Sequence, residues 1–249
     1  MDKLLYVAMS GAKETLRAQA ANNHNLANAS TTAFKADLSA FQSRAVAGPG
    51  YASRVYATDD SVGWDTSNGS QLATGNPLDL SINGSGYITV QDLTGNEAYT
   101  RAGDLHVDPT GQLLTSTGAP VMGDSGPISV PPYSSIAIAS DGTISIVPLG
   151  QTAQTSAIVG RIKLVNPPIS NITHGADGLY HTTDGVPAEA DASTTVTAGT
   201  LESSNVNIAS AMVNMIELAR HFDMQIKALH SADEDAQAST KLLQSSSSG

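Results

Sequence analysis

Few residues of the 249-residue sequence stand at spacings that support catalysis. The sequence contains no cysteine, which excludes thiolate nucleophiles, thiolate metal sites and disulfide bonds. Ser10 and Lys13 fit the S-x-x-K pattern of serine acyl-enzymes, but neither an S-D-N nor a K-T-G partner motif accompanies them. Residues 84–86 read Gly-Ser-Gly, part of a dinucleotide fingerprint, yet the residues that follow predict a strand, which offers no helix N-terminus to a pyrophosphate. These matches therefore indicate chance and turn formation rather than chemistry.

The histidines and the turn aspartates also lack the arrangement of a metal or catalytic site. The six histidines form no H-E-x-x-H motif and no pair four residues apart, the spacing that places two imidazoles on one helical face. Aspartates accompany the turn glycines without the alternating oxygen ligands of a calcium loop; they are Asp104, Asp108, Asp141 and Asp177. Two carboxylates from distant parts of a chain can still meet in space, so an unrecognised hydrolase stays open as an alternative. We expect no enzyme, no metal and no cofactor.

The charge and hydropathy of the chain exclude further classes of protein. Its 23 acidic and 12 basic residues give a net charge of -11, which disfavours binding to nucleic acid or to an anionic membrane surface. The acidic excess lies in the middle, at residues 45–203, whereas both ends are nearly neutral. No stretch approaches the roughly 18 consecutive apolar residues of a membrane span. The apolar run at 4–9 is too short for a cleavable signal peptide, so any export should use another route.

Helical patterns occupy both ends of the chain. Residues 1–44 predict a helix up to about Asn28, with apolar residues at steps of three and four, and residues 204–249 carry a stronger seven-residue repeat. The predicted seam residues are Leu5, Met9, Leu16 and Leu26 in the first helix and Ile208, Met215, Leu218, Phe222 and Leu229 in the second. The first helix is rich in asparagine and its apolar stripe is poor, so it needs a partner. We expect the terminal helices to pack in a coiled-coil-like pair, within one chain or between subunits.

Short antiparallel strands are predicted in the middle of the chain. Apolar and polar residues alternate at 78–82, 87–91, 136–139, 144–146 and 161–164, and turn signals such as Asn83-Gly84 separate these segments. We assign residues 71–203 to a central β-rich domain and residues 45–70, which show little pattern, to an extended connector. The helical regions 1–44 and 204–249 are expected to pair. The predicted fold class is α+β, with a discontinuous pair of long terminal helices and a central antiparallel β-rich domain.

Four separated motifs resemble those of the flagellar rod, hook and hook-associated axial proteins. The first covers residues 21–35 (ANNHNLANASTTAFK), in which Ala33 stands where that family usually has glycine. The others are residues 76–87 (NPLDLSINGSGY), residues 99–113 (YTRAGDLHVDPTGQL), and residues 199–207 (GTLESSNVN) with Met215-Ile216 after them. The motifs follow the order of the family over nearly the whole chain. If the family glycine takes a positive φ, Ala33 is strained at this position.

The resemblance implies a structural, non-catalytic subunit of the bacterial flagellar basal body. Within the family, the length and the brief connector are most like the proximal rod proteins; a distal rod protein or another axial member is the alternative. Such a subunit would pass through the flagellar type III export apparatus without a cleaved signal peptide. It would then assemble with other proximal and distal rod proteins into a hollow, helical drive shaft in the periplasm that serves motility.

The first motif is the implied assembly motif, with Asn25, Leu26, Ala27, Asn28, Thr31, Phe34 and Lys35 as its residues. We expect the asparagines of the first helix, Asn22, Asn25 and Asn28, to exchange hydrogen bonds between subunits or to line a polar bore. A merely solvated helix face is the alternative. From the residues alone, an envelope enzyme or a carbohydrate-binding β-domain with exposed aromatic side chains also stays open.

Overall fold

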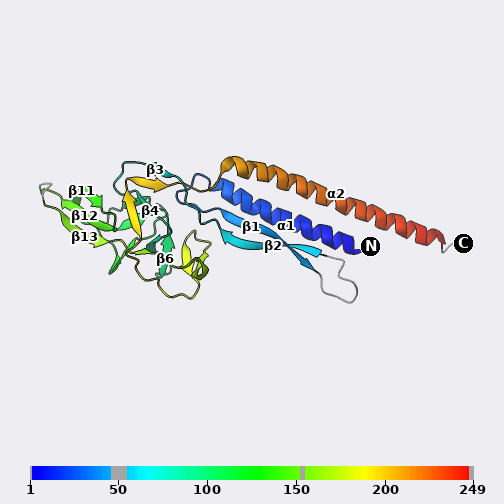
Figure 1. The fold of residues 1–249 in the computed structure, drawn as a ribbon, viewed down its shortest axis with the longest axis horizontal. Coiled ribbons are helices and arrows are strands. Elements are labelled where there is room, and N and C mark those ends of the chain that lie inside the picture. The colour runs from blue at the N-terminus through cyan, green and yellow to red at the C-terminus, as the bar shows by residue number, and fades with distance from the viewer. Residues whose placement is uncertain (1, 46–54, 152–154, 247–249) are drawn as a thin grey trace. The chain divides into compact units, whose positions relative to one another are not determined.

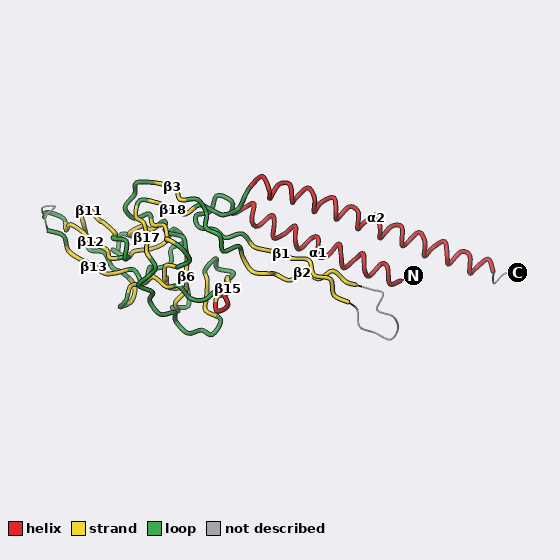
Figure 2. The backbone as a smooth tube through the Cα atoms, in the orientation of Figure 1, coloured by secondary structure: helices red, strands yellow, loops and turns green. Residues whose placement is uncertain are grey.

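The computed structural model describes residues 2–45, 55–151 and 155–246 and has an α+β fold (Figure 1). Contacts divide the chain into two compact units. The helical unit comprises Met1–Ala29, Lys35–Asp65 and Val206–Gly249, and the β unit comprises Ser30–Phe34 and Thr66–Asn205. Two helices and several antiparallel sheets make up the described residues, as Figure 2 shows, so the predicted class and the β-rich middle are confirmed.

Two long helices dominate the helical unit. They are α1 (Asp2–Ala27) and α2 (Ile208–Ser246), and they lie side by side in Figure 1. At the start of α2 the Asn207 side-chain oxygen accepts a hydrogen bond of 3.0 Å from the Ser210 amide and so caps the helix. The Asn22 amide donates to the Ala211 carbonyl at 2.9 Å, and Gly11 lies against Gln225. These two contacts make the helices antiparallel.

A β-hairpin completes the helical unit, and the sequence analysis did not predict it. Strand β1 (Asp37–Ala45) pairs antiparallel with β2 (Val55–Trp64), from Asp37 opposite Trp64 to Ala45 opposite Val55. Residues 55–64, assigned above to an extended connector, are thus a hairpin strand, and residues 37–44 belong to its partner. Val55 and Tyr56 favour a strand, but the paired Asp59 and Asp60 have low strand propensity, and this hid the pattern.

The β unit consists of short strands in separate antiparallel sheets. A five-stranded sheet has the order β14-β5-β6-β16-β15, and a three-stranded sheet has the order β11-β12-β13. The two-stranded pairs are β4 with β17, β3 with β18, β7 with β8, and β9 with β10. The bounds are β3 Gln71–Ala73, β4 Leu80–Asn83, β5 Tyr87–Gln91, β6 Glu97–Thr100, β7 Leu105–Val107, β8 Leu113–Thr115, β9 Met122–Gly123, β10 Gly126–Pro127, β11 Tyr133–Ile138, β12 Thr143–Pro148, β13 Ala157–Arg161, β14 Leu164–Val165, β15 Ile172–His174, β16 Tyr180–Thr182, β17 Thr195–Ala198 and β18 Thr200–Glu202, with a 3₁₀ turn at Ile169–Asn171.

Aliphatic side chains form the core of the β unit. Leu80, Ile88, Val90 and Ile144 are among those fully excluded from solvent. The only aromatic residue buried as completely among the described residues is Tyr99, whose hydroxyl oxygen accepts a hydrogen bond of 2.7 Å from the Ala188 amide. Strands of two to six residues suffice here because their buried side chains join one shared core.

Aspartates organise the tight turns between these strands. In six of them a carboxylate oxygen accepts the backbone amide two residues later, at 2.8 to 3.1 Å; the residues are Asp92, Asp108, Asp141, Asp177, Asp184 and Asp191. This local bond replaces a backbone turn contact, which explains why aspartate recurs at these positions. Among the helices described, none has both the length and the hydropathy needed to cross a bilayer.

Candidate assembly site

The asparagines of the first motif hold the end of α1 to the hairpin of the helical unit. The Asn25 amide nitrogen donates to the Asp37 carbonyl at 2.9 Å, and its oxygen accepts from the Asp37 amide at 2.8 Å. His24 Nδ1 lies 2.7 Å from a carboxylate oxygen of the same aspartate. Asn28 bonds the His24 carbonyl through both its backbone amide and its side chain, at 3.1 and 3.0 Å, and so closes the last turn of α1. The motif therefore fixes how the chain leaves α1.

Asn22 completes this set one turn earlier. Its side chain is 9% exposed and donates to the Ala211 carbonyl of α2. The sequence analysis expected Asn22, Asn25 and Asn28 to bond neighbouring subunits or to line a bore, but the structure gives each a partner inside the chain. An amide carries donors and an acceptor, so it can satisfy backbone groups at helix ends that apolar residues would leave unpaired.

The second half of the motif belongs to the β unit. Ala33 has a φ of 55°, the left-handed conformation expected for the glycine that it replaces, and it is the only non-glycine residue with a positive φ in the described chain. Its amide donates to the Glu202 carbonyl at 2.8 Å. The Phe34 amide bonds the Thr31 carbonyl at 3.3 Å, and the Phe34 carbonyl accepts from the Asn205 amide at 3.2 Å. This stretch is thus bonded to residues 202 and 205, which belong to the last of the four family motifs.

The remaining members of the motif differ in burial. Leu26 is half-buried, Ala27 is exposed, and Lys35 is buried at 5% exposure, which is unusual for a lysine. Among them, Leu26 and Ala27 lie in α1, while Lys35 lies just before β1. The structure therefore assigns them no common surface.

Large apolar side chains of the predicted seam face outward to different degrees. Met9, Leu16 and Ile208 are about half exposed, at 53, 50 and 49%. Leu26, Met215, Leu218, Phe222 and Leu229 are half-buried, and the Leu5 side chain lies outside the described residues. Further apolar residues that the sequence analysis did not single out are exposed on the same helices: Tyr6, Met212, Val213, Ile216 and Met224.

Small residues fill the interior of the helical unit instead. Ala8, Ala12, Thr15 and Ala18 of α1 are buried, as is Ala211 of α2. A Cβ atom at Gly11 would lie 2.9 Å from the Gln225 side chain, so this side chain of α2 packs against α1 at the glycine. The seam was predicted from large residues, whereas the contact within the subunit uses small ones. Among the described residues, several large apolar side chains of both helices are therefore about half exposed.

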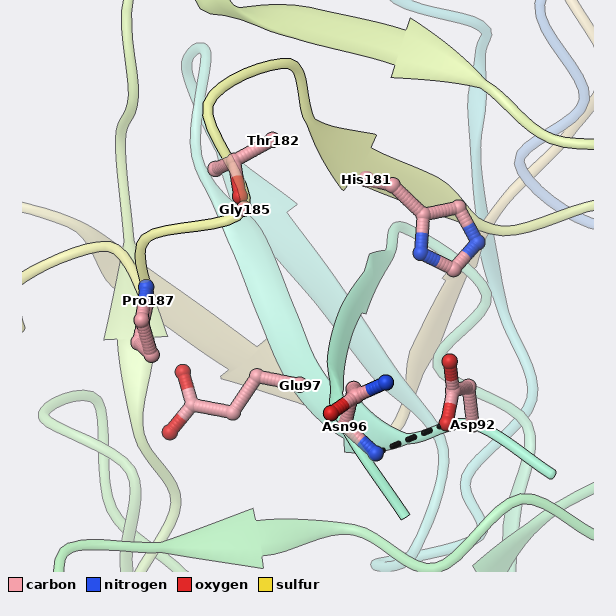
Figure 3. Close-up of a pocket in the computed structure, with 7 residues that line it drawn as sticks. All are labelled: Asp92, Asn96, Glu97, His181, Thr182, Gly185 and Pro187. Atoms are coloured by element: carbon pink, nitrogen blue, oxygen red, sulfur yellow. Dashed lines mark hydrogen bonds between the residues drawn. The ribbon is translucent and has the colours of Figure 1, made fainter. Parts of the chain in front are cut away.

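A polar hollow in the β unit is a candidate ligand site. It encloses about 240 Å³ and is lined by Asp92, Asn96, Glu97, His181, Thr182, Gly185 and Pro187 (Figure 3). Each ionisable side chain around it has a partner of its own. Glu97 accepts two bonds from Lys163 Nζ at 2.9 and 2.8 Å, and His181 Nε2 lies 3.0 Å from Asp177.

The carboxylate of Asp92 also has hydrogen-bond partners, namely Thr94 and Asn96. Burial would raise the pKa of Asp92, but hydrogen bonds from Thr94 and Asn96 hold it below its ordinary value. A general acid or base needs a pKa nearer to neutral pH, so the lowered pKa of Asp92 does not suit this carboxylate to that role. Within the described residues, no three histidine, aspartate or glutamate side chains converge in a way that would hold a metal ion.

Comparison with known proteins identifies the family. Residues 81–146 match the family model described as the flagellar hook protein FlgE/F/G D1 domain, and residues 197–242 match the flagellar basal body rod FlgEFG protein C-terminal model. The chain is 43% identical to the flagellar basal-body rod protein FlgF of Escherichia coli (strain K12) and 43% identical to FlgF of Salmonella typhimurium; each alignment covers 98% of the chain and 99% of the relative. It is 33% identical to the rod protein FlgG of Buchnera aphidicola from Acyrthosiphon pisum, over 88% of the chain and 92% of the relative.

The chain therefore belongs to the flagellar hook and basal-body rod protein family. Its similarity to FlgF extends over nearly the full length of both proteins. The resemblance that the four motifs indicated is confirmed.

Proposed function

We propose that this chain is a structural, non-catalytic subunit of the bacterial flagellar basal-body rod, of the proximal FlgF type. The observation that carries the proposal is the outward-facing set of large apolar side chains on α1 and α2, in a chain whose relatives are named as basal-body rod proteins. Eight large apolar side chains in the described parts of the two helices are about half exposed, which suits a subunit whose neighbours cover them.

The seam residues give this assembly its energy. A fully buried aliphatic side chain contributes about 1.5–3 kcal/mol, so one that is half exposed in the free subunit has about 1 kcal/mol left to gain on assembly. Several such side chains on two helices provide a surface that neighbouring subunits can cover in coiled-coil-like packing. Contacts of this kind between unlike surfaces build an open helical array, in which proximal and distal rod proteins are the partners.

The remaining parts of the proposal follow from the family. The subunit leaves the cytoplasm through the flagellar type III export apparatus without a cleaved signal peptide, and it functions in the periplasmic part of the basal body. Binding of nucleic acid, of a metal or of a cofactor has no part in this role.

The test introduces a variant gene into a strain in which the natural gene is disrupted. The variant replaces one exposed apolar residue of α2 that lies next to the predicted seam. Ile216 of α2 is 55% exposed, so Ile216→Asp should leave the fold of the subunit intact, as judged by circular dichroism, while it abolishes swimming and filaments. Asn214→Asp is the matched control, because it adds the same charge to an exposed position of the same helix segment and should support swimming. Normal swimming of the gene-disruption strain would refute the rod assignment, and full complementation by Ile216→Asp would refute the assembly surface.

Phe222 tests the half-buried part of the seam. Phe222→Ala should prevent assembly and leave the β unit folded. Loss of β-unit structure would show instead that this side chain supports the fold of that unit.

A further inference from the structure

Three passes of the chain enter or leave the β unit, and they meet at one residue. The passes are residues 30–34, which follow α1, residues 66–70, which follow the hairpin, and residues 202–205, which precede α2. All three lie within the β unit as contacts define it. Any force that reaches this unit through the chain must arrive through these passes, so the bonds between them determine how the unit is held.

Glu202, in the third pass, bonds both of the others. Its backbone carbonyl accepts from the Ala33 amide at 2.8 Å, and its Oε1 accepts from the Gly69 amide at 3.0 Å. Its other carboxylate oxygen, Oε2, accepts from Arg101 Nε and Nη2 at 3.0 and 2.7 Å. Both carboxylate oxygens are therefore in use, and the side chain is 2% exposed.

Arg101 anchors this carboxylate to the body of the β unit. Its guanidinium is 3% exposed, donates through Nη1 to the carbonyls of Gly84 and Gly86 at 3.0 and 2.7 Å, and reaches the Asn68 side chain at 3.3 Å. It also lies over the Tyr87 ring, 5.9 Å from the ring centre. The arginine thus joins the turn between β4 and β5 to the second and third passes.

Further bonds tie the second and third passes to each other. The Ser203 amide donates to the Ser70 carbonyl at 2.8 Å, and the Asn205 side chain donates to the Ser67 carbonyl at 3.1 Å. A Cβ atom at Gly69 would lie 1.9 Å from the Ser203 carbonyl oxygen, so only glycine allows the two passes to come this close. The second and third passes are therefore held together by close backbone contact and hydrogen bonds, and not by buried apolar side chains.

We propose that Arg101 and Glu202 are positioning residues that lock the three passes into a single clamp. A buried ion pair is a poor source of net stability, because desolvation offsets most of its attraction, and an apolar pair would stabilise the core equally well. A charged pair with every polar atom engaged does something that an apolar pair cannot, since it dictates which backbone groups lie against one another. The inference goes beyond the proposed function, because it concerns the isolated chain and holds whatever the chain assembles with.

Amide hydrogen exchange on the full-length chain tests the clamp through Glu202→Gln. Glutamine has the same shape but only one side-chain acceptor oxygen, so it cannot serve both Gly69 and Arg101. We expect protection of the Gly69 amide to fall by about tenfold or more. The Ala33 amide is the decisive probe, because its acceptor is the unchanged backbone carbonyl of residue 202. If the passes form one clamp, Ala33 loses protection together with Gly69, while the core amide of Thr89, which donates to the Lys163 carbonyl at 3.0 Å, keeps its protection.

Glu97→Gln is the matched control. Glu97 also receives two hydrogen bonds from a cation in the same unit, Lys163, and it lies in β6, outside the three passes. It should leave Ala33 and Gly69 protected. The clamp is refuted if Glu202→Gln affects Gly69 alone, if it lowers the protection of Thr89 equally, or if Glu97→Gln has the same effect.

Arg101→Lys provides a second route if Glu202→Gln does not fold. Lysine keeps the charge but offers one nitrogen in place of three, so it cannot bond Glu202 twice and also reach the Gly84 and Gly86 carbonyls. Ala33 and Gly69 should both exchange several-fold faster in a folded protein. Unchanged exchange at both amides in this variant would also overturn the proposal.

Discussion

Ala33 provides a direct measure of backbone strain in this fold. An L-residue in the left-handed region costs about 1–2 kcal/mol relative to a right-handed or extended conformation, and Ala33 adopts it with a φ of 55°. Ala33→Gly removes that cost. Two losses oppose the gain: the buried methyl group contributes about 0.8 kcal/mol, since Ala33 is 6% exposed, and the extra freedom of glycine in the unfolded chain costs about 0.4–1 kcal/mol. The terms nearly cancel, so Ala33→Gly should change the free energy of unfolding by less than about 0.5 kcal/mol.

Ala98→Gly is the matched control in the same unit. Ala98 lies in β6 and is fully buried, and it has no positive φ to relieve. The same chemical change should therefore cost about 1.5 kcal/mol. Urea unfolding followed by circular dichroism measures both variants, and the difference of about 1.5 kcal/mol is the strain at Ala33. Equal destabilisation by the two substitutions would refute the reasoning, because Ala33 would then carry no strain.

Two further predictions concern the turns and the helix pair. In the folded chain, hydrogen bonds from the Thr110 side chain and from the Gln112 and Thr110 amides hold the pKa of Asp108 below its ordinary value of 3.8. Because the folded pKa is the lower one, this stabilisation is present above about pH 4 and disappears as the pH falls further. The midpoint of thermal unfolding should therefore drop between about pH 5 and pH 3. This drop should be smaller in Asp108→Asn, which has no carboxylate to protonate at this position. Asn22→Ala removes the buried bond to the Ala211 carbonyl and should destabilise the helical unit by about 1–3 kcal/mol. Asn23→Ala, at an exposed position of α1, should change the stability of this unit by less than about 0.5 kcal/mol. Equal urea midpoints for these two variants would contradict the assigned contact.

Much of the architecture could be predicted because it depends on local pattern. The end of α1 near Asn28, the cap at Asn207 and the aliphatic strands of the β unit all follow from neighbouring residues in the sequence. The positive φ of Ala33 was also accessible, because the resemblance placed glycine there. Such features need no knowledge of distant contacts.

The hairpin and the clamp could not be predicted in the same way. Strand β2 contains Asp59 and Asp60, which have low strand propensity, and its pairing with β1 stabilises it. A propensity scale considers single residues and does not include such pairing. Arg101 and Glu202 lie in two different motifs and are 101 positions apart in the sequence, so no local pattern pairs them. One signal was available: an arginine and a glutamate, both within apolar or small-residue surroundings, need each other if they are buried. The small-residue contact between α1 and α2 could not be predicted from the seven-residue repeat, because that pattern marks large apolar side chains.

The turn aspartates change the meaning of the net charge of -11. Six carboxylates accept hydrogen bonds from nearby backbone amides and so stabilise turns. Their negative charges are therefore a by-product of turn formation. Asparagine offers the same acceptor oxygen without the charge, and relatives could therefore differ widely in isoelectric point while keeping every turn. The acidity of this β unit is a consequence of its many short strands, and it does not by itself imply a basic partner.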